Sequence, residues 1–478
     1  MSGFFMDDIK NKIEKLESTI KKNLPFTPNE DQETAIKKIS KYVFNSYPNS
    51  LFILKGYAGT GKTNLISGIT KSLKSIGWKS VLLAPTGRAA KVISNYSQTK
   101  AYTIHKKIFN YSFETSGSNY LSIAENTHTN TLFIIDEASM IQSNDENSSG
   151  LNLLESLFEY VYSGLNCKIM FVGDNAQLPP VGSSFSAALS PEYLKANFDL
   201  NIFFYELKKV ARQKEDSGIL YNATKLRIDL MEKDFISPKL EPTADFIRLS
   251  GEDLEDTLNQ TIQKYGEDNL LIVTRSNKRA ALFNQTYRNR IKYLEDELNS
   301  GDKIMIVKNN YYWLPSSNSE TNFIANGDIA EITKIKNKKS LYGFEFCDCE
   351  IRLIDYQLPP LEVKLNLNAL YSEQASLSNE QQNQLQEAVL EDVAHEPDKY
   401  TRIRYLKNSP YFNALQVKPA YAVTCHKSQG GQWPVVFIDQ GYLTKEMLNR
   451  EYTRWLYTAI TRATEKAYLI NFNEDFFL

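Results

Sequence analysis

The stretch "GYAGTGKT", Gly56 to Thr63, decides the fold of this chain. It fits the pattern G-x-x-x-x-G-K-[ST] without a mismatch. The apolar run "LFIL" precedes it and the helical segment "NLISGITKSL" follows it, which is the context that a phosphate-binding loop requires. Glycines let backbone N–H groups close around phosphate oxygens, and the amino end of the helix adds a partial positive charge. The stretch therefore predicts a nucleoside triphosphate site.

The residues of this loop divide the expected contacts between the phosphates and a metal ion. Lys62 is expected to reach the β- and γ-phosphates of ATP, and the Thr63 hydroxyl is expected to bind Mg²⁺. The residues of this stretch and the one after it that are expected to contact the nucleotide are Gly56, Ala58, Gly59, Thr60, Gly61, Lys62, Thr63 and Asn64.

A second stretch, "TLFIIDEASM" from Thr131 to Met140, reads as a buried strand that ends in two carboxylates. Ligands of open α/β sheets bind at the carboxyl ends of the strands, where Asp136 and Glu137 would lie. We expect Asp136 to hold Mg²⁺ and Glu137 to activate the attacking water. Taken alone, the stretch is equally compatible with a solvated acidic turn, and the preceding phosphate loop favours the catalytic interpretation.

The composition limits the class of protein. A chain of 478 residues with 42% hydrophobic residues is long enough for several packed domains. Because the net charge is −2, any nucleic-acid site must be a local patch rather than the whole surface. Four cysteines are too few for a disulfide framework, and we find neither a signal peptide nor an apolar run of about 18 residues. We expect a cytoplasmic protein that does not enter a membrane.

The order of apolar runs predicts an α/β fold with an insertion. Short runs alternate with helix-sized segments from Leu51 onward, and the alternation resumes at "NLLIVTRS". Such alternation is typical of parallel sheets covered by helices. Residues 300–415 begin instead with strand-like segments separated by polar turns, which favours a small β-barrel or an antiparallel sheet. Residues 107–130 read as a hairpin.

Five further stretches of the sequence resemble the motifs of a known protein family. These are "APTGRAAKV" at Ala84–Val92, "TIHK" at Thr103–Lys106, "GDNAQLPPVG" at Gly173–Gly182, "TCHKSQGGQW" at Thr424–Trp433 and "YTAITRA" at Tyr457–Ala463. Together with the two stretches above, and in this order, they resemble the motif set of superfamily-one helicases. "TIHK" is similar to the additional motif of the RecD-like and Dda-like branch, SF1B. The resemblance extends from Gln32 to Arg462.

The resemblance implies a domain organisation. The first of two RecA-like P-loop motor domains would span residues 1–200, with a β-hairpin pin inserted at 107–130. The second would combine residues 201–299 and 416–478, and an SH3-like β domain would be inserted in it at 300–415.

The resemblance also implies roles for individual residues at the nucleotide. Gln32 resembles the glutamine that reads the adenine edge, and Gln177 resembles the one that senses the γ-phosphate. Arg212 and Arg462 resemble the two arginines that reach the γ-phosphate. Gln432 stands where related proteins place a polar or acidic residue on the ribose.

A further set of residues is expected at the nucleic acid. The expected DNA contacts are Pro85, Thr86, Arg88, His105, Lys106, Pro179, Thr424, His426 and Lys427. The aromatic side chains expected on the pin are Phe109, Tyr111 and Phe113. An ordinary hairpin packed on its own domain is the alternative to a pin that splits a duplex.

The resemblance implies an ATP-dependent, Mg²⁺-dependent helicase. It would move 5′-to-3′ on single-stranded DNA, act at junctions of single and double strands, and work as a monomer in replication, recombination or repair. Two alternatives stay open: a RecD-type motor subunit of a recombination nuclease complex, and a regulatory P-loop ATPase that does not translocate.

Overall fold

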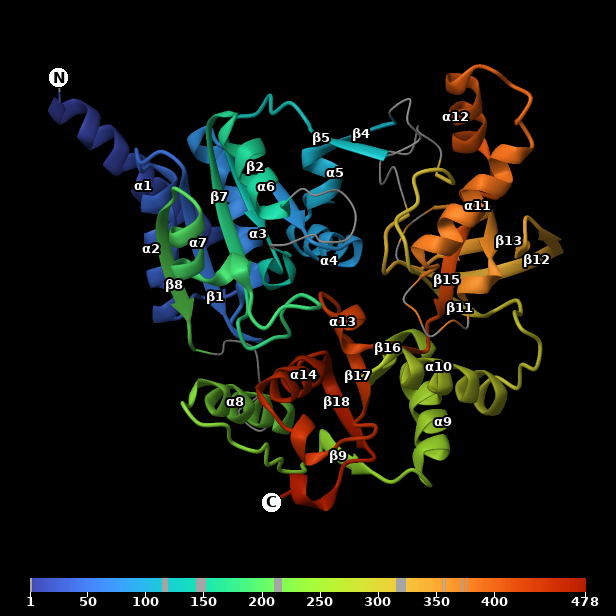
Figure 1. The fold of residues 1–478 in the computed structure, drawn as a ribbon. Coiled ribbons are helices and arrows are strands. Elements are labelled where there is room, and N and C mark those ends of the chain that lie inside the picture. The colour runs from blue at the N-terminus through green and yellow to red at the C-terminus, as the bar shows by residue number, and fades with distance from the viewer. Residues whose placement is uncertain are drawn as a thin grey trace. The chain divides into compact units, whose positions relative to one another are not determined.

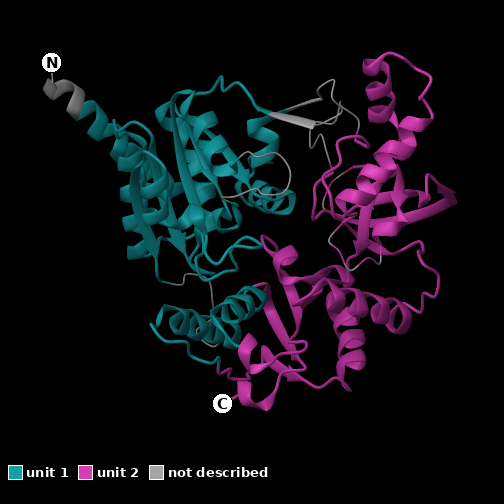
Figure 2. Cartoon of the chain, in the orientation of Figure 1, with its two compact units in different colours: residues 1–112, 120–238, 448–461 teal, residues 113–119, 239–447, 462–478 magenta. Residues whose placement is uncertain are grey.

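The computed structural model describes residues 2–113, 119–142, 152–209, 217–314, 324–354, 356, 358–370, 372, 374 and 376–478. The chain divides into two compact units (Figure 2). Unit 1 contains residues 1–112, 120–238 and 448–461, and unit 2 contains residues 113–119, 239–447 and 462–478. Within the described part of the chain, no helix combines the length and the hydropathy that a membrane crossing needs.

Unit 1 is built on a six-stranded parallel sheet with the strand order β3-β2-β6-β7-β1-β8 (Figure 1). Its strands are β1 (Ser50–Gly56), β2 (Lys79–Ala84), β3 (Ala101–Thr103), β6 (Thr129–Ile135), β7 (Leu165–Gly173) and β8 (Asn201–Leu207). The run "LFIL" is apolar throughout because Leu51 and Ile53 pack into one core while Phe52 and Leu54 pack into another. A parallel sheet buried on both faces needs this composition.

Helices cover both faces of this sheet. The core around Phe52 also contains side chains of α1 (Ser2–Asn23), α2 (Glu30–Val43), α3 (Lys62–Leu73) and α4 (Gly87–Ser97). The core around Leu51 contains side chains of α5 (Ile104–Ile108), α6 (Leu153–Tyr162) and α7 (Pro191–Asn197). The two cores hold the sheet rigid, so the loops at its carboxyl edge have a fixed base.

The domain boundary expected after residue 200 falls too early. Strand β8 pairs with β1 along its whole length, from Ser50 opposite Asn201 to Gly56 opposite Leu207. The backbone of β8 therefore completes the first sheet rather than starting the second domain. Unit 1 also includes α8 (Gly218–Met231) and α14 (Arg450–Ile460), although α14 lies more than two hundred residues later in the sequence.

Unit 2 contains a five-stranded parallel sheet with the order β16-β10-β17-β18-β9. Its strands are β9 (Phe246–Leu249), β10 (Leu270–Thr274), β16 (Ala422–Thr424), β17 (Trp433–Asp439) and β18 (Ala463–Ile470). The helix α9 (Leu254–Tyr265) connects β9 to β10, and the helix α10 (Asn277–Thr286) follows β10. The second α/β domain expected from the sequence is thereby confirmed.

The insertion between β10 and β16 is a closed five-stranded barrel, as the sequence predicts. Its strands are β11 (Lys303–Ile306), β12 (Ile329–Leu341), β13 (Phe344–Leu353), β14 (Leu361–Asn366) and β15 (Leu415–Pro419). Two helices, α11 (Asn379–Glu391) and α12 (Lys399–Asn408), lie between β14 and β15 in the sequence. Because β15 closes the barrel, the insertion extends to residue 419 rather than 415.

The expected hairpin is present as a two-stranded sheet of β4 (Phe109–Phe113) and β5 (Asn119–Ile123). The turn between them and the side chains of Tyr111 and Phe113 lie outside the described residues. Phe109 is 5% exposed and belongs to the core of unit 1. Its burial contradicts its assignment to the working surface of a pin, since a buried ring cannot meet a duplex; Phe109 anchors the hairpin instead.

Candidate nucleotide and nucleic-acid site

The phosphate loop joins the end of β1 to the start of α3. Gly59 and Gly61 adopt φ values of 79° and 87°, in the left-handed region that glycine adopts without strain. A Cβ atom on Gly61 would lie 2.6 Å from Nε2 of Gln32. The second glycine of the motif is therefore required both by the backbone conformation and by the side chain packed against it.

Lys62, the first residue of α3, folds back over the loop. Its ammonium donates to the backbone oxygens of Gly56, at 2.6 Å, and Tyr57, at 3.0 Å. The side chain is only partly buried. The two carbonyls thus hold the ammonium group at the mouth of the loop, where phosphate oxygens would bind.

Gln32 is fixed against the same loop. Its Nε2 donates to the backbone oxygen of Thr60 at 3.0 Å, and its Oε1 accepts from the backbone N–H of Asn29 at 3.1 Å. The second bond belongs to a capping box at the start of α2. Gln32 is thus positioned beside the nucleotide loop, as its expected role requires, and both atoms of its amide already have a partner.

Asp136 and Glu137 follow β6 at the carboxyl edge of the sheet, as predicted. The backbone N–H of Asp136 donates to Leu83 on β2 at 2.9 Å, and that of Glu137 donates to Oδ1 of Asp136 at 3.0 Å. Burial, followed by the neighbouring carboxylate of Glu137, raises the pKa of Asp136 to about 7. A divalent cation would stabilise two adjacent carboxylates of which one has a raised pKa.

Gln177 lies in the loop that follows β7. Its side chain is 5% exposed. Among the residues that the structure describes, its Oε1 atom has no hydrogen-bond partner. A buried acceptor without a partner costs roughly 1–3 kcal/mol, so this amide fits a position that a ligand or its water completes.

Tyr457, on α14, links two of the predicted stretches within unit 1. Its hydroxyl accepts from the backbone N–H of Ala58 in the phosphate loop at 3.0 Å and donates to Oδ2 of Asp174 at 2.7 Å. Next to it, Oγ1 of Thr458 accepts from the backbone N–H of Leu178 at 2.9 Å. Sequence reasoning did not single out Tyr457, although it opens the quoted stretch "YTAITRA".

The Tyr457→Phe substitution tests this bridge. We expect it to lower the free energy of unfolding of unit 1 by about 1–3 kcal/mol, because the buried Asp174 carboxylate loses a donor. The measurement is the urea transition in which unit 1 unfolds, followed by hydrogen exchange of its backbone amides. Tyr47→Phe, which removes an exposed hydroxyl, is the control and should change little. An unchanged transition in Tyr457→Phe would mean that the bridge does not form in solution.

The residues of unit 1 expected to contact DNA lie after β2 and β3. Thr86 caps α4 through a 3.2 Å bond from the N–H of Ala89, and His105 and Lys106 lie in α5. Burial, followed by the charge of Lys100, lowers the pKa of Lys106 to about 8. A phosphate would offset both effects, since an opposite charge favours the ammonium form.

The remaining expected DNA contacts of unit 1 divide into two groups. Pro85 and Arg88 are partly exposed beside Thr86. Pro179, with Pro180, is buried. The burial of Pro179 contradicts its expected contact with DNA, because its ring packs inside the protein instead.

In unit 2 the expected DNA contacts follow β16. Thr424 ends that strand, and His426 and Lys427 lie in the short helix α13 (Cys425–Ser428). The ammonium of Lys427 donates to Oδ1 of Asn326, in the barrel, at 2.7 Å. Cys425 is 1% exposed, and burial raises the pKa of its thiol to about 12, so it is not a nucleophile.

The last three predicted nucleotide contacts are Gln432, Arg462 and Arg212. Gln432 is exposed just before the amino end of β17, whereas Thr424 lies at the carboxyl end of β16. The two residues are therefore at opposite ends of the parallel strands of the second sheet. Arg462 is 3% exposed, and its Nη1 donates to the backbone oxygen of Gly431 at 3.2 Å. Arg212 lies outside the described residues.

The order of strands in unit 1 brings the predicted motifs together on one edge. All six strands are parallel, so their carboxyl ends face the same way. Along this edge His105 follows β3, Thr86 follows β2, Asp136 follows β6 and Gln177 follows β7. The phosphate loop follows β1. The nucleotide candidates are therefore neighbours, and the DNA candidates adjoin them.

Two protein families match the chain. The AAA domain matches residues 27–233, and the UvrD-like helicase C-terminal domain matches residues 419–470. The first match contains the phosphate loop, the acidic pair and β8. The second contains the stretches around His426 and Arg462.

Relatives and solved structures add to these matches. The chain is 25% identical over 492 residues to an uncharacterized protein of Methanocaldococcus jannaschii, covering 92% of this chain and 38% of that protein. It is 33% identical over 131 residues to the ATP-dependent RecD2 DNA helicase of Deinococcus radiodurans, covering 27% of this chain and 16% of that one. It thus spans well under half the length of both relatives.

The fold is shared with a solved protein. The crystal structure of a Pif1 helicase from Bacteroides, in complex with ADP-AlF3 and ssDNA, superposes with a TM-score of 0.50 and 14% sequence identity, covering 95% of both chains. The two parallel sheets and the barrel described above are therefore an architecture seen before.

Proposed function

We propose that the chain is a member of the RecD-like branch of superfamily-one helicases and an ATP-dependent DNA helicase that moves on single-stranded DNA. The matches to the AAA domain and to the UvrD-like helicase C-terminal domain support this proposal. The observation that carries this proposal is the carboxyl edge of the first sheet. There the phosphate loop, the acidic pair and Gln177 adjoin the residues expected to hold DNA. Hydrolysis of the nucleotide can therefore affect the contacts to single-stranded DNA through one rigid sheet.

The residues fit a Mg²⁺-nucleotide. The ammonium of Lys62 lies over the loop, Gln177 offers an acceptor that lacks a partner among the described residues, and the pKa of Asp136 is raised. Thr63 and Asp136 would hold Mg²⁺, and ATP supplies the transferable phosphoryl group. Phosphoryl transfer needs positioning and neutralised charge more than covalent help from the protein. Glu137 would orient and deprotonate the attacking water.

We propose that both units contact the single-stranded DNA. In unit 1 the contacts come from Thr86, Arg88 and Lys106, and in unit 2 from Thr424 and Lys427. Hydroxyls and a few cations suit a sugar–phosphate track that must be released in every cycle. Each phosphate neutralised on a single strand adds about −0.7 to the salt slope. The cycle requires that ATP turnover changes which unit holds the strand.

The direction of movement is part of this proposal. We expect duplexes with a 5′ single-stranded tail to be unwound and duplexes with a 3′ tail to be left intact. The measurement is strand separation with ATP and Mg²⁺, with a blunt duplex as the control. Preference for the 3′ tail would overturn the 5′-to-3′ assignment. ATPase activity that DNA does not stimulate would instead favour a regulatory P-loop ATPase.

We propose action as a monomer inside the cell on single strands and junctions, in replication, recombination or repair. Strand separation by the chain alone supports a monomeric motor. A requirement for a nuclease subunit would favour the RecD-type alternative.

A further inference from the structure

Arg227, on α8, lies against the phosphate loop within unit 1. The central carbon of its guanidinium is 4.2 Å from the centre of the ring of Tyr57, the second residue of that loop. A cation over the face of an aromatic ring is attracted by the negative charge of that face. The side chain of Arg227 is only partly buried, so part of it stays accessible to a ligand.

Tyr57 presents a fixed surface to this guanidinium. Its side chain is 6% exposed, and its hydroxyl donates to Oε1 of Glu206, on β8, at 2.9 Å. Its backbone oxygen accepts from the hydroxyl of Thr60 at 2.8 Å and from the ammonium of Lys62 at 3.0 Å. The loop and the ring are therefore held together, and the ring restricts where the guanidinium can lie.

The guanidinium of Arg227 lacks polar partners in the part of the chain that the structure describes. Its Nε atom is buried without a hydrogen-bond acceptor, and no described carboxylate forms an ion pair with it. A buried donor without an acceptor is costly, and a charged donor is more so. The fold keeps this unpaired donor beside the loop at which phosphate oxygens would bind.

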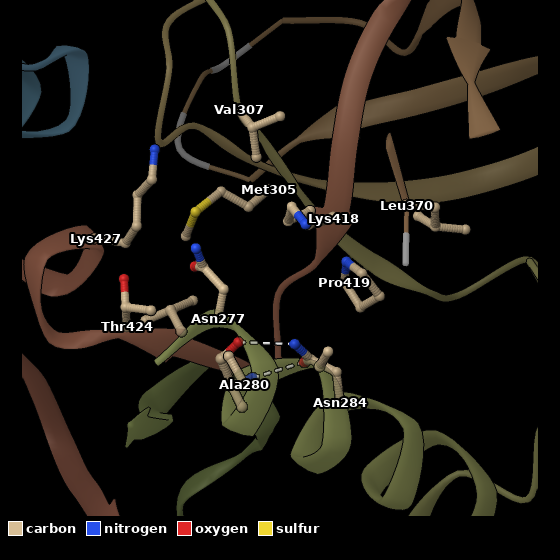
Figure 3. A pocket seen from close by; sticks show the side chains of 13 residues that line it. Asn277, Ala280, Asn284, Met305, Val307, Leu370, Lys418, Pro419, Thr424 and Lys427 are labelled. Carbon is tan, nitrogen blue, oxygen red and sulfur yellow. Dashed lines mark hydrogen bonds between the residues drawn. The ribbon is translucent and has the colours of Figure 1, made fainter. Parts of the chain in front are cut away.

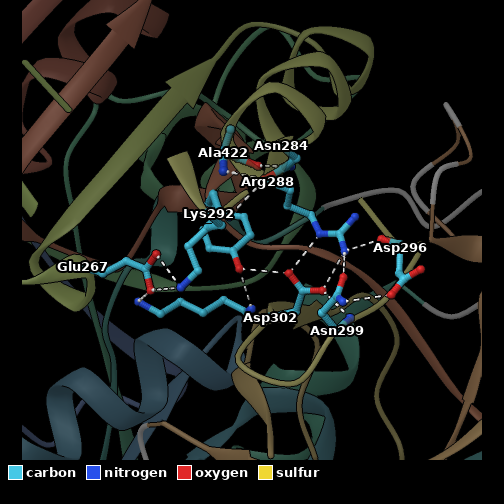
Figure 4. A network of polar contacts seen from close by, with 10 residues as sticks. Glu267, Asn284, Arg288, Lys292, Asp296, Asn299, Asp302 and Ala422 are labelled. Carbon is cyan, nitrogen blue, oxygen red and sulfur yellow. Dashed lines mark hydrogen bonds and ion pairs between the residues drawn. The ribbon is translucent and has the colours of Figure 1, made fainter. Parts of the chain in front are cut away.

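Buried and half-buried cations of unit 2 do have such partners. The guanidinium of Arg288 makes two 2.9 Å bonds to the carboxylate of Asp302 (Figure 4). Lys418 and Lys427 line a pocket between the second sheet and the barrel, and each donates to a neutral oxygen of the protein (Figure 3). Arg227 differs from these three cations because its buried Nε has no acceptor among the described residues.

A phosphate is the ligand that this arrangement suits. A guanidinium is always charged, and its planar fork of donors matches the oxygens of a phosphate. The loop beside it supplies backbone N–H groups, the amino end of a helix and the ammonium of Lys62. A second cation beside that loop would neutralise more of the negative charge of a bound triphosphate.

We propose that Arg227 is a further ATP-binding residue, whose guanidinium donates to the phosphate chain, and that Tyr57 positions it. The inference rests on the proposed function and deepens it, since Arg227 lies outside all the motifs quoted from the sequence. It adds a contact to those expected from Arg212 and Arg462. Because α8 follows β8 in the chain, the contact would also join this helix to the bound nucleotide.

Removing the guanidinium tests the phosphate contact. Arg227→Gln should weaken binding of a fluorescent ATP analogue at least about tenfold, the effect of one hydrogen bond between charged groups. Lys225→Gln makes the same change of charge two residues earlier, on another side of α8, and should bind the analogue as the wild type does. Unchanged affinity in a folded Arg227→Gln protein would overturn the proposal.

A second variant and a second measurement separate nucleotide binding from bracing of the loop. Arg227→Lys keeps the charge but loses the planar fork, so it should recover only part of the affinity. If only this variant folds, wild-type affinity in it would overturn the proposal. The urea transition of unit 1 without nucleotide should stay close to that of the wild type, because the lost ring contact is offset by loss of an unpaired donor. A lowered transition with unchanged ATP affinity would show that Arg227 only braces the loop.

Changes at Tyr57 test its positioning role. Tyr57→Leu removes the ring and should weaken ATP binding in the otherwise unchanged protein, but it should have little further effect in Arg227→Gln. Tyr57→Phe retains the ring and should keep most of the affinity. Equal weakening by Tyr57→Leu in both backgrounds would show that Tyr57 acts without Arg227, and its positioning role would be excluded.

The outcomes for ATP and ADP separate this inference from the proposed function. If the wild type binds no ATP, both proposals fail. If the wild type binds and hydrolyses ATP and Arg227→Gln binds it equally well, the helicase proposal stands and this inference fails. If Arg227→Gln weakens binding of ATP but not of ADP, the contact is to the γ-phosphate, and weakening of both places it at the α- or β-phosphate.

Discussion

The Lys62→Ala variant is expected to lose ATP hydrolysis by at least about 10²-fold. The ammonium of Lys62 is held by the carbonyls of Gly56 and Tyr57 at the mouth of the phosphate loop. There it would neutralise charge that develops on the phosphates during transfer. Steady-state phosphate release in the presence of single-stranded DNA measures the loss. Binding of single-stranded DNA should be largely retained, because the expected DNA contacts of unit 1 follow β2 and β3, whereas Lys62 follows β1.

Lys71→Ala provides the matched control for Lys62. Lys71 lies on the same helix, about two and a half turns away, and is exposed. It should hydrolyse ATP at the wild-type rate. Full turnover by Lys62→Ala would remove the loop from the nucleotide site and with it the basis of the proposed function.

The Arg462→Ala variant is expected to bind ATP and to hydrolyse it about 10³-fold more slowly or worse, the range known for arginine fingers. Arg462 is 3% exposed, and its Nη1 donates to the backbone oxygen of Gly431 at 3.2 Å. A guanidinium is always charged and presents a planar fork of donors, which suits the oxygens of a phosphate. Single-turnover hydrolysis, combined with binding of a fluorescent ATP analogue, separates lost chemistry from lost binding.

Arg462→Lys distinguishes charge from geometry. Lysine keeps the charge but lacks the planar fork, so most of the rate should still be lost. Arg450→Ala, which removes an exposed arginine of α14, is the control for overall charge and should hydrolyse ATP normally. Turnover at the wild-type rate in a folded Arg462→Ala protein would exclude the residue from the reaction.

The sequence predicted the parallel sheets and the barrel because their signals are local. The run "LFIL" and the loop after it specify a strand, a tight turn and a helix within about twenty residues. The alternating segments of β12 and β13 specify a barrel wall in the same way. Asp136 and Gln177 could be expected at the nucleotide because each follows a strand of one parallel sheet.

Other positions could not be predicted, because their environment depends on distant segments. Phe109 reads as an exposed aromatic of a hairpin, yet it is buried by the core of unit 1. Pro179 is expected to contact DNA and is also buried. Strand β8 resembles the start of a new domain and instead pairs with β1, which lies about 150 residues earlier.

The sequence by itself determined the chemistry, because a phosphate loop and its acidic partner are made of contiguous residues whose backbone conformation glycine and strand propensity enforce. Only the tertiary structure decided which distant groups meet them. Tyr457 reaches Ala58 and Asp174 because α14 packs in unit 1. Lys418 shares a pocket with Lys427 because the barrel is bonded to the second sheet through Arg288 and Asp302. Long-range packing and buried hydrogen bonds, which no local pattern encodes, set those partnerships.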